Sequence, residues 1–224
     1  MVGRGDEAVF TKVAASPDEA LATIGDGVTV MIGGFGGAGT PVALREALAR
    51  RRLKRLTLVA NNADFGSFMY EGGLVRLICS YPGGQSSTPV IAAIEAGEVE
   101  LVLTPQGTLA ETIRAGGAGL GGVLTPTGLD MEFGARYQEI EHDGRRWLLA
   151  PSIRADIALV KGSVADAYGN VVSRSAGINF NPLMAMAADY TVAQVEKIVA
   201  VGEIDPQDVT IPSLLVDAVV EVAP

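Results

Sequence analysis

The chain contains a single cysteine and a single histidine among its 224 residues. One cysteine, Cys79, excludes an intrachain disulfide and fits a reducing compartment. Because Cys79 lies in an apolar run, we expect it in the core. The only histidine, His142, has no motif around it, so the sequence predicts neither a metal site nor a Ser-His-Asp triad.

Long apolar runs and an excess of positive charge are also missing. No run reaches the ~18 residues that a membrane-spanning helix needs, and the N-terminus has no signal-peptide core. The net charge is −9, whereas a nucleic-acid-binding protein needs a basic surface. The one dense basic run, Arg50 to Arg55, is interpreted as the charged end of a helix, with a phosphorylated ligand as the alternative. We therefore expect a cytoplasmic protein that binds neither membrane nor nucleic acid.

Aromatic residues make up only 5% of the chain, whereas glycines number 28. Apolar runs of strand length alternate with helical patterns, and this order predicts an α/β fold with a mainly parallel sheet flanked by helices on both faces. Residues 137–149 predict a small β-hairpin excursion with a His-Asp-Gly turn, and residues 167–172 a second turn between strands. We expect residues 1–224 to form a single domain. The expected strands are residues 28–32, 56–60, 75–81, 99–104, 155–160, 190–195 and 214–220.

Helix starts are predicted from capping residues. Ser16 followed by Glu19, and Thr108 followed by Glu111, fit the capping-box pattern. Thr40 is expected to cap a helix that has Pro41 in its first turn. On this interpretation Gln106 and Gly107 lie just before the N-terminus of the helix that Thr108 caps.

The glycine cluster GGFGGAG, Gly33 to Gly39, includes the pattern G-x-G-x-x-G of dinucleotide-binding proteins. In those proteins an acidic residue follows about 20 residues later, but here the next strand leads into Asn61 and Asn62. The sequence therefore disfavours a nicotinamide or flavin site. A tight turn is a second explanation, yet five glycines in seven residues exceed what a turn needs. The surplus favours a backbone that approaches a ligand closely and offers N–H groups.

These residues carry a resemblance to a known family. Asp26 to Pro41 is similar to the signature of the family I coenzyme A transferases: Asp-Gly, a short apolar run, Gly-Gly-Phe, three residues, Gly, any residue and Pro. The likeness continues in order through NNA at Asn61, CSYP at Cys79, PQGT at Pro105 and NFNP at Asn179. It covers nearly the whole chain and is strongest to the A (alpha) subunit of 3-oxoacid CoA-transferases.

The resemblance implies a fold and a reaction. A CoA-transferase-like chain moves CoA from an acyl-CoA, such as succinyl-CoA or acetyl-CoA, to a short 3-oxo acid, acetoacetate or 3-oxoadipate. A glutamate becomes a glutamyl-CoA thioester on the way, but its Ser-Glu-Asn-Gly motif is absent here. The resemblance therefore implies a partner, the B (beta) subunit, which carries this glutamate in a heterodimer or heterotetramer. Coenzyme A thioester is then a substrate, and no permanently bound cofactor is expected.

The site residues are carried over position by position. Gln106 matches the family's oxyanion-stabilising glutamine, and it precedes a helix whose N-terminal dipole favours negative charge. A CoA-ester hydrolase and a non-catalytic CoA- or nucleotide-binding protein stay open as alternatives. Residues 83–98 depart from the family pattern, which leaves the acid specificity open. The implied CoA-binding residues are Gly33, Gly34, Phe35, Gly36, Gly37, Ala38, Gly39, Asn61 and Asn62.

Overall fold

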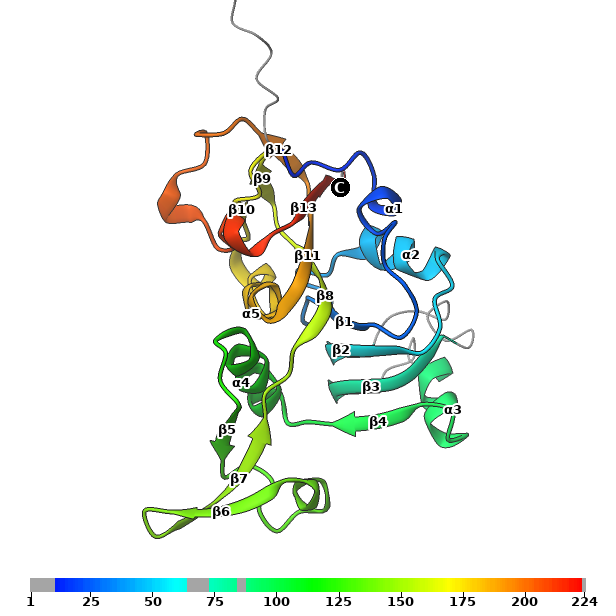
Figure 1. The fold of residues 1–224 in the computed structure, drawn as a ribbon, viewed down its shortest axis with the longest axis vertical. Helices are drawn as coiled ribbons and strands as arrows, with labels where there is room; N and C mark the ends of the chain where they lie inside the picture. Colours follow the sequence, from blue (N-terminus) through cyan, green and yellow to red (C-terminus); the bar gives the residue numbers. More distant parts are fainter. Residues whose placement is uncertain (1–10, 64–72, 84–87, 223–224) are drawn as a thin grey trace, which may run out of the picture.

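A computed structural model describes residues 11–63, 73–83 and 88–222 of the chain. Its main sheet has seven strands in the order β13-β11-β8-β1-β2-β3-β4, and all neighbouring strands run parallel (Figure 1). The predicted parallel sheet is thereby confirmed. The strands are β1 (Thr29–Ile32), β2 (Leu56–Asn62), β3 (Leu74–Tyr81), β4 (Glu100–Leu103), β8 (Ala155–Lys161), β11 (Ala188–Val195) and β13 (Ala218–Glu221).

Helices cover both faces of this sheet, as the sequence predicts. Alternate residues of β1 enter two separate cores: Val30 and Ile32 pack with α1, α2 and α3, whereas Met31 packs with α4 and α5. No helix in the described part of the chain is long and apolar enough to cross a membrane. The helices are α1 (Pro17–Ala20), α2 (Val42–Arg50), α3 (Thr88–Glu95), α4 (Gln106–Gly117) and α5 (Asn181–Ala187).

Two small three-stranded sheets extend from the main one. The predicted hairpin is confirmed as β6 and β7, joined by Asp143 and Gly144 with φ of 50° and 68°, the positive values of a type I′ turn. Strand β5 completes this sheet, which projects away from the seven-stranded sheet below α4 (Figure 1). The second predicted turn is also confirmed, because β9 and β10 pair antiparallel. The small sheets contain β5 (Gly122–Thr125), β6 (Gln138–His142), β7 (Arg145–Pro151), β9 (Val164–Asp166), β10 (Val171–Val172) and β12 (Lys197–Val199).

Four 3₁₀ helices lie in the connections. The strand expected at residues 214–220 is shorter than predicted, because its first part belongs to one of these helices and only β13 pairs with β11. They are η3 (Glu132–Arg136), η4 (Ser175–Gly177), η5 (Pro206–Asp208) and η6 (Ser213–Leu215).

The start of α2 differs from the prediction. Thr40 does not cap this helix: the N-cap residue is Pro41, and no side chain of the N-cap bonds to the first turn. The side-chain oxygen Oε1 of Gln194 accepts hydrogen bonds from the backbone N–H groups of Ala43 (2.9 Å) and Leu44 (3.3 Å). The donors that a helix start leaves unsatisfied are therefore paired by a glutamine from β11, about 150 residues away.

The other two predicted caps give opposite results. Ser16 is confirmed, since its hydroxyl accepts a hydrogen bond from the N–H of Glu19 at 3.1 Å. The capping box at Thr108 is wrong, because α4 begins at Gln106 with Pro105 as its N-cap. Gln106 is thus the first residue of the helix and not part of the loop before it.

The basic run at residues 50–55 lies at the end of α2, as interpreted. The Arg50 guanidinium pairs with the Asp18 carboxylate at 2.7 Å, and Arg51 donates to the carbonyl of Ile24 at 2.8 Å. The pair with Arg50 holds the pKa of the Asp18 carboxyl below its usual value. These contacts tie the end of α2 to α1 and account for the run without a ligand.

Replacing Gln194 with Met tests the remote cap of α2. Gln194→Met keeps the length of the side chain but removes the acceptor, so we expect a free energy of unfolding lower by about 1–2 kcal/mol. Urea denaturation followed by circular dichroism measures the difference. The control is Gln207→Met on the exposed η5, for which we expect a change within about 0.5 kcal/mol. Equal stabilities of the two variants would contradict the role of Gln194.

Candidate functional site

The glycine cluster forms a tight hairpin directly after β1. The backbone N–H and C=O groups of Phe35 and Ala38 bond to each other in both directions at 3.0 Å. Between them, Gly36 and Gly37 have φ of 57° and 89°. Two consecutive positive φ values are typical of a type I′ turn, which strongly favours glycine or asparagine. Two of the five glycines are therefore explained by the turn alone.

Two asparagines from the segment before and at the start of α5 hold this hairpin. The side chain of Asn179 accepts from the N–H of Gly34 at 3.2 Å and donates to the carbonyl of Ala38 at 3.0 Å. Asn181, fully buried, donates to the carbonyl of Gly39 at 3.0 Å. The loop is thus fixed by side-chain amides from the second half of the chain.

The remaining three glycines are required by close contacts inside the chain. A Cβ on Gly33 would lie 1.9 Å from Oδ1 of Asn181, and a Cβ on Gly34 would lie 2.3 Å from Oγ1 of Thr40. A Cβ on Gly39 would lie 2.4 Å from the nearest backbone carbonyl oxygen. All five glycines therefore have a cause within the fold, and the surplus of glycines does not by itself indicate a ligand.

The loop offers fewer free donors than the sequence suggests. The N–H of Gly33 donates to the carbonyl of Leu159 at 2.9 Å, and three further loop N–H groups are used in the contacts above. Within the described residues, the N–H groups of Gly36, Gly37 and Gly39 have no acceptor. Any main-chain contact to a ligand from this loop must therefore come from its tip or its last glycine.

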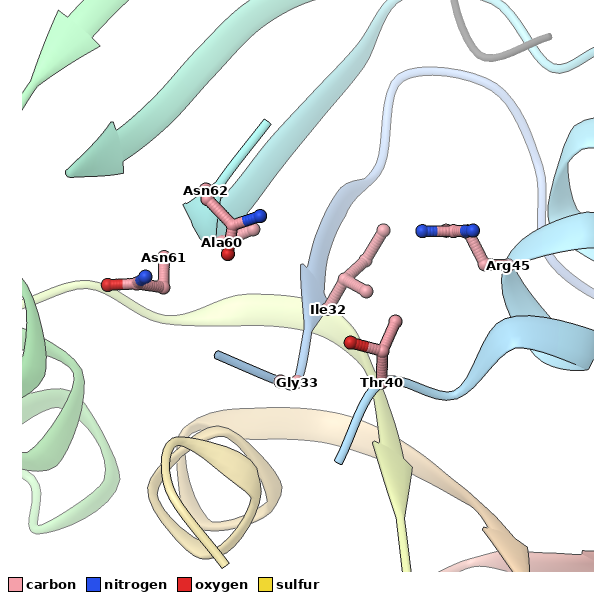
Figure 2. Close-up of a pocket in the computed structure, with 8 residues that line it drawn as sticks. Ile32, Gly33, Thr40, Arg45, Ala60, Asn61 and Asn62 are labelled. Carbon is pink, nitrogen blue, oxygen red and sulfur yellow. The ribbon is translucent and has the colours of Figure 1, made fainter. Parts of the chain in front are cut away.

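A small pocket lies where β1 and β2 end, at the carboxyl edge of the sheet (Figure 2). Ligands of open α/β sheets bind at this edge. The pocket measures about 20 Å³, enough for about one water molecule, so it can hold only one group of a larger ligand. It brings four of the predicted site residues together. Its lining consists of Ile32, Gly33, Gly34, Thr40, Arg45, Ala60, Asn61 and Asn62.

Asn61 and Asn62 are the last two residues of β2, which is two residues longer than the sequence predicts. Their side chains point to opposite faces, since successive strand residues alternate (Figure 2). Asn61 is 6% exposed, and its Oδ1 is buried without a hydrogen-bond partner. A buried acceptor without a partner costs about 1–3 kcal/mol. This oxygen is therefore an available acceptor at the edge of the sheet.

Gln106 and Phe35 lie at the same edge but outside the pocket. Gln106 follows β4, which β3 separates from β2, and its side chain is exposed. Phe35 is 44% exposed on the glycine hairpin. The structure thus places Gly33, Gly34, Asn61 and Asn62 together and leaves Gln106 and the hairpin tip beside them.

Several nucleophiles that the chain might supply are already engaged or buried. Burial raises the pKa of the Cys79 thiol to about 12, so the thiol stays protonated at neutral pH. The Glu111 carboxylate bonds to Arg114 at 2.8 Å, and the Glu139 carboxylate bonds to Arg146. Among the described residues that line the pocket, none is acidic.

Sequence reasoning did not identify Asn179, Asn181 and Gln194 as residues that shape the site. The segment NFNP served only as one piece of the resemblance. Asn179 has a φ of 22°, a value that favours asparagine over most residues, but such a preference leaves no mark in one sequence. The contacts join residues 141–151 positions apart, so no local pattern predicts them.

Comparison with known proteins identifies the chain. An open parallel sheet with helices on both faces and a pocket at its carboxyl edge defines it as an α/β protein of the type that binds ligands at that edge. The model of the family described as "Coenzyme A transferase" matches residues 14–222, and the chain belongs to this family of enzymes.

Individual relatives agree with this assignment. The chain is 42% identical to the A (alpha) subunit of the 3-oxoadipate CoA-transferase of Acinetobacter baylyi, over 96% of both chains. It is 46% identical to the mitochondrial succinyl-CoA:3-ketoacid coenzyme A transferase 2 of Homo sapiens, over 94% of this chain and 45% of that one. Its fold resembles that of glutaconate coenzyme A-transferase from Acidaminococcus fermentans, with a TM-score of 0.86 at 21% identity, covering 95% of this chain and 76% of that one.

Adding one methyl group at Gly33 tests how the loop is held. In Gly33→Ala the new Cβ collides with Oδ1 of Asn181 and displaces an amide that also bonds to the N–H of Lys161 and the carbonyl of Gly39. We expect the free energy of unfolding to fall by about 2–4 kcal/mol, as measured by urea denaturation. The control is Gly25→Ala, because a Cβ there meets nothing within 4 Å. A loss below about 1 kcal/mol would contradict the clamp.

Proposed function

We propose that this chain is the A (alpha) subunit of a heteromeric 3-oxoacid CoA-transferase. It moves CoA from an acyl-CoA, such as succinyl-CoA or acetyl-CoA, to a short 3-oxo acid, acetoacetate or 3-oxoadipate. The observation that carries the proposal is the unpartnered Oδ1 of Asn61 at the carboxyl edge of the sheet, next to the glycine loop. Residues 1–224 act as one domain, and the enzyme works in the cytoplasm.

The binding role follows from the groups available at this edge. Coenzyme A carries amide N–H groups in its pantetheine arm, and a buried acceptor such as Oδ1 of Asn61 pairs with one of them. Asn62 lines the pocket on the opposite face of β2. The N–H groups of Gly36, Gly37 and Gly39 are the free donors of the loop. The neighbouring Phe35 and Ala38 hold the tip in place, and Phe35 offers an exposed ring to the arm.

Gln106 stabilises negative charge in the transition state. It is the first residue of α4, a helix of 12 residues that lacks a side-chain cap. The N-terminal N–H groups and the helix dipole favour an anion at this position. When a carboxylate attacks a thioester, its carbonyl oxygen becomes an oxyanion, and donors aimed at that oxygen typically contribute ~10²–10³-fold in rate.

The nucleophile comes from the partner, the B (beta) subunit. Its glutamate attacks the acyl-CoA carbonyl and releases the CoA thiolate, leaving an anhydride. The thiolate attacks the glutamyl carbonyl of the anhydride, which frees the first acid and leaves glutamyl-CoA. The acceptor acid reverses both steps and leaves as its CoA ester. Coenzyme A thioester is thus a substrate, and no resident cofactor takes part.

Three findings support a two-chain enzyme with this substrate class. The chain spans 45% of the human relative, so that protein contains a second half of similar length. The Acinetobacter relative is by its name one subunit of an enzyme that acts on 3-oxoadipate. No acidic residue lines the Asn61 pocket within the described part of the chain. Since these relatives are named transferases, CoA transfer is favoured over hydrolysis and over a non-catalytic binding role.

Activity of the isolated chain tests the division of the site between two polypeptides. We expect the purified chain to show no transfer from succinyl-CoA to acetoacetate, because it lacks the nucleophile, and full transfer once the B (beta) subunit is added. Formation of acetoacetyl-CoA measures the rate, and intact-protein mass spectrometry locates the glutamyl-CoA adduct. Turnover by the chain alone, or an adduct on this chain, would refute the proposal.

Substitutions of Gln106 and Asn61 separate rate from binding in the assembled enzyme. We expect Gln106→Ala to lower kcat by ~10²-fold with a small change in KM, because it removes an oxyanion donor. Asn61→Ala removes an acceptor for bound CoA, so we expect KM for acyl-CoA to rise about 10-fold with a smaller effect on kcat. Each variant is the control for the other. An unchanged kcat in Gln106→Ala removes that residue from the reacting centre.

A further inference from the structure

A second, larger cavity lies between the first turns of α4 and strand β5 of the small sheet. It measures about 550 Å³ and does not include Asn61 or the glycine loop. Its size falls in the range of small-molecule sites, ~300–1,000 Å³. Its walls include Gly107 and Thr108 from α4, and Val123 and Leu124 from β5. Gly107 has no atoms within 4 Å of where a Cβ would lie, so the helix backbone is open on this side.

The N-terminus of α4 opens on this cavity without a cap. The N-cap residue is Pro105, whose side chain cannot accept a hydrogen bond. The first N–H of the helix with an acceptor inside the chain is that of Leu109, which bonds to the carbonyl of Pro105 at 2.8 Å. In the described structure the N–H groups of Gln106, Gly107 and Thr108 have no acceptor. These three donors, at the positive end of the helix dipole, favour an anion.

The hydroxyl of Thr108 is an independent sign of a ligand. Thr108 is 6% exposed and lines the cavity, and its Oγ1 is buried without a hydrogen-bond partner. Threonine hydroxyls in helices commonly bond to a carbonyl three or four residues back. Thr112, one turn later, does so with the carbonyl of Leu109 at 3.0 Å. Thr108 thus has an unused hydroxyl beside the unused N–H groups.

The charges at the cavity are balanced by one ion pair. Nε of Arg114 and Oε2 of Glu111 are 2.8 Å apart, and both side chains are about half exposed. The pair leaves the wall close to neutral, so the helix terminus and the Thr108 hydroxyl set the preference for an anion. Val123 and Leu124 give the opposite wall an apolar surface.

We propose that this cavity binds the second carboxylate of a dicarboxylic 3-oxo acid. Donors to that carboxylate are the N–H groups of Gly107 and Thr108 and the Thr108 hydroxyl, while the carbon chain lies against Val123 and Leu124. The inference rests on the proposed function, in which the acid is the acceptor of CoA. Because Gln106 directly precedes Gly107, the reacting carboxyl group and the second carboxylate bind to adjacent residues of one helix. An acid with one carboxylate leaves these donors unused.

Acceptor selectivity of the assembled enzyme tests the cavity. With succinyl-CoA as donor, we expect Thr108→Val to lower kcat/KM for 3-oxoadipate about 10-fold, mainly through KM. The value for acetoacetate should stay within about twofold. Thr112→Val is the matched control, because it removes a hydroxyl from the same helix outside the cavity. Equal losses for both acids, or no loss for either, would overturn the proposal.

A second variant should shift the selectivity in the opposite direction. Glu111→Gln removes the one carboxylate that lines the cavity and frees the Arg114 guanidinium for the ligand. We therefore expect kcat/KM for 3-oxoadipate to rise about threefold while that for acetoacetate is unchanged. Damage to the fold cannot produce such a gain. A fall in kcat/KM for 3-oxoadipate in Glu111→Gln would contradict a carboxylate in the cavity.

Binding without turnover distinguishes failure of this inference from failure of the proposed function. Isothermal titration of the isolated chain with adipate and with hexanoate needs no CoA transfer. We expect adipate to bind more tightly, and Thr108→Val to remove the difference. If the assembled enzyme transfers no CoA but adipate binding depends on Thr108, only the proposed function fails. Adipate binding that does not depend on Thr108, or no binding, overturns the cavity proposal.

Discussion

The carboxyl edge of the sheet depends on the hydrogen bonds that Asn179 and Asn181 make to the glycine loop. Five glycines add conformational entropy to the unfolded chain, about 0.5–1 kcal/mol each. Three side-chain bonds reach the loop from residues 141–145 positions away, each worth about 0.5–1.5 kcal/mol. The two quantities are similar, so the asparagines offset the cost of a loop that would otherwise sample many conformations. Replacing an amide of this pair would free the loop while leaving the sheet intact.

A fixed loop matters because binding to a mobile one would require ordering it first, at a cost in affinity. The hairpin has its free N–H groups at Gly36 and Gly37, where the I′ turn holds both in one conformation. Gln194 acts in the same way at the next element, since it bonds to the first turn of α2 from β11. Side-chain amides from the C-terminal half of the chain therefore set the geometry of the edge that the N-terminal strands form. Loop and helix start can move only if α5 or β11 moves with them.

This long-range dependence explains which features the sequence could predict. The alternation of Val30, Met31 and Ile32 between two cores, and the Asp143–Gly144 turn, arise from residues close together in the chain. Local patterns therefore predict the parallel sheet and the hairpin. The helix starts failed where the partner is remote or absent: Gln194 replaces Thr40, and the first turn of α4 has no side-chain cap. The glycines of the loop misled for the same reason, because Asn181 and Thr40, and not only a ligand, occupy the space of their missing side chains.

The uncapped start of α4 connects the two proposed sites. A capping serine or aspartate at position 105 would satisfy the N–H groups of the first turn and place an oxygen where an anion must bind. Proline supplies no such oxygen and leaves the donors available. The stability lost by omitting the cap, about 1 kcal/mol, is recovered only when a negatively charged group occupies the site. In a reaction that moves a carboxylate in and an oxyanion through, this helix end stabilises charge that is present only during turnover. Since catalysis requires stronger binding of the transition state than of the ground state, the missing cap serves the reaction at a small cost to the fold.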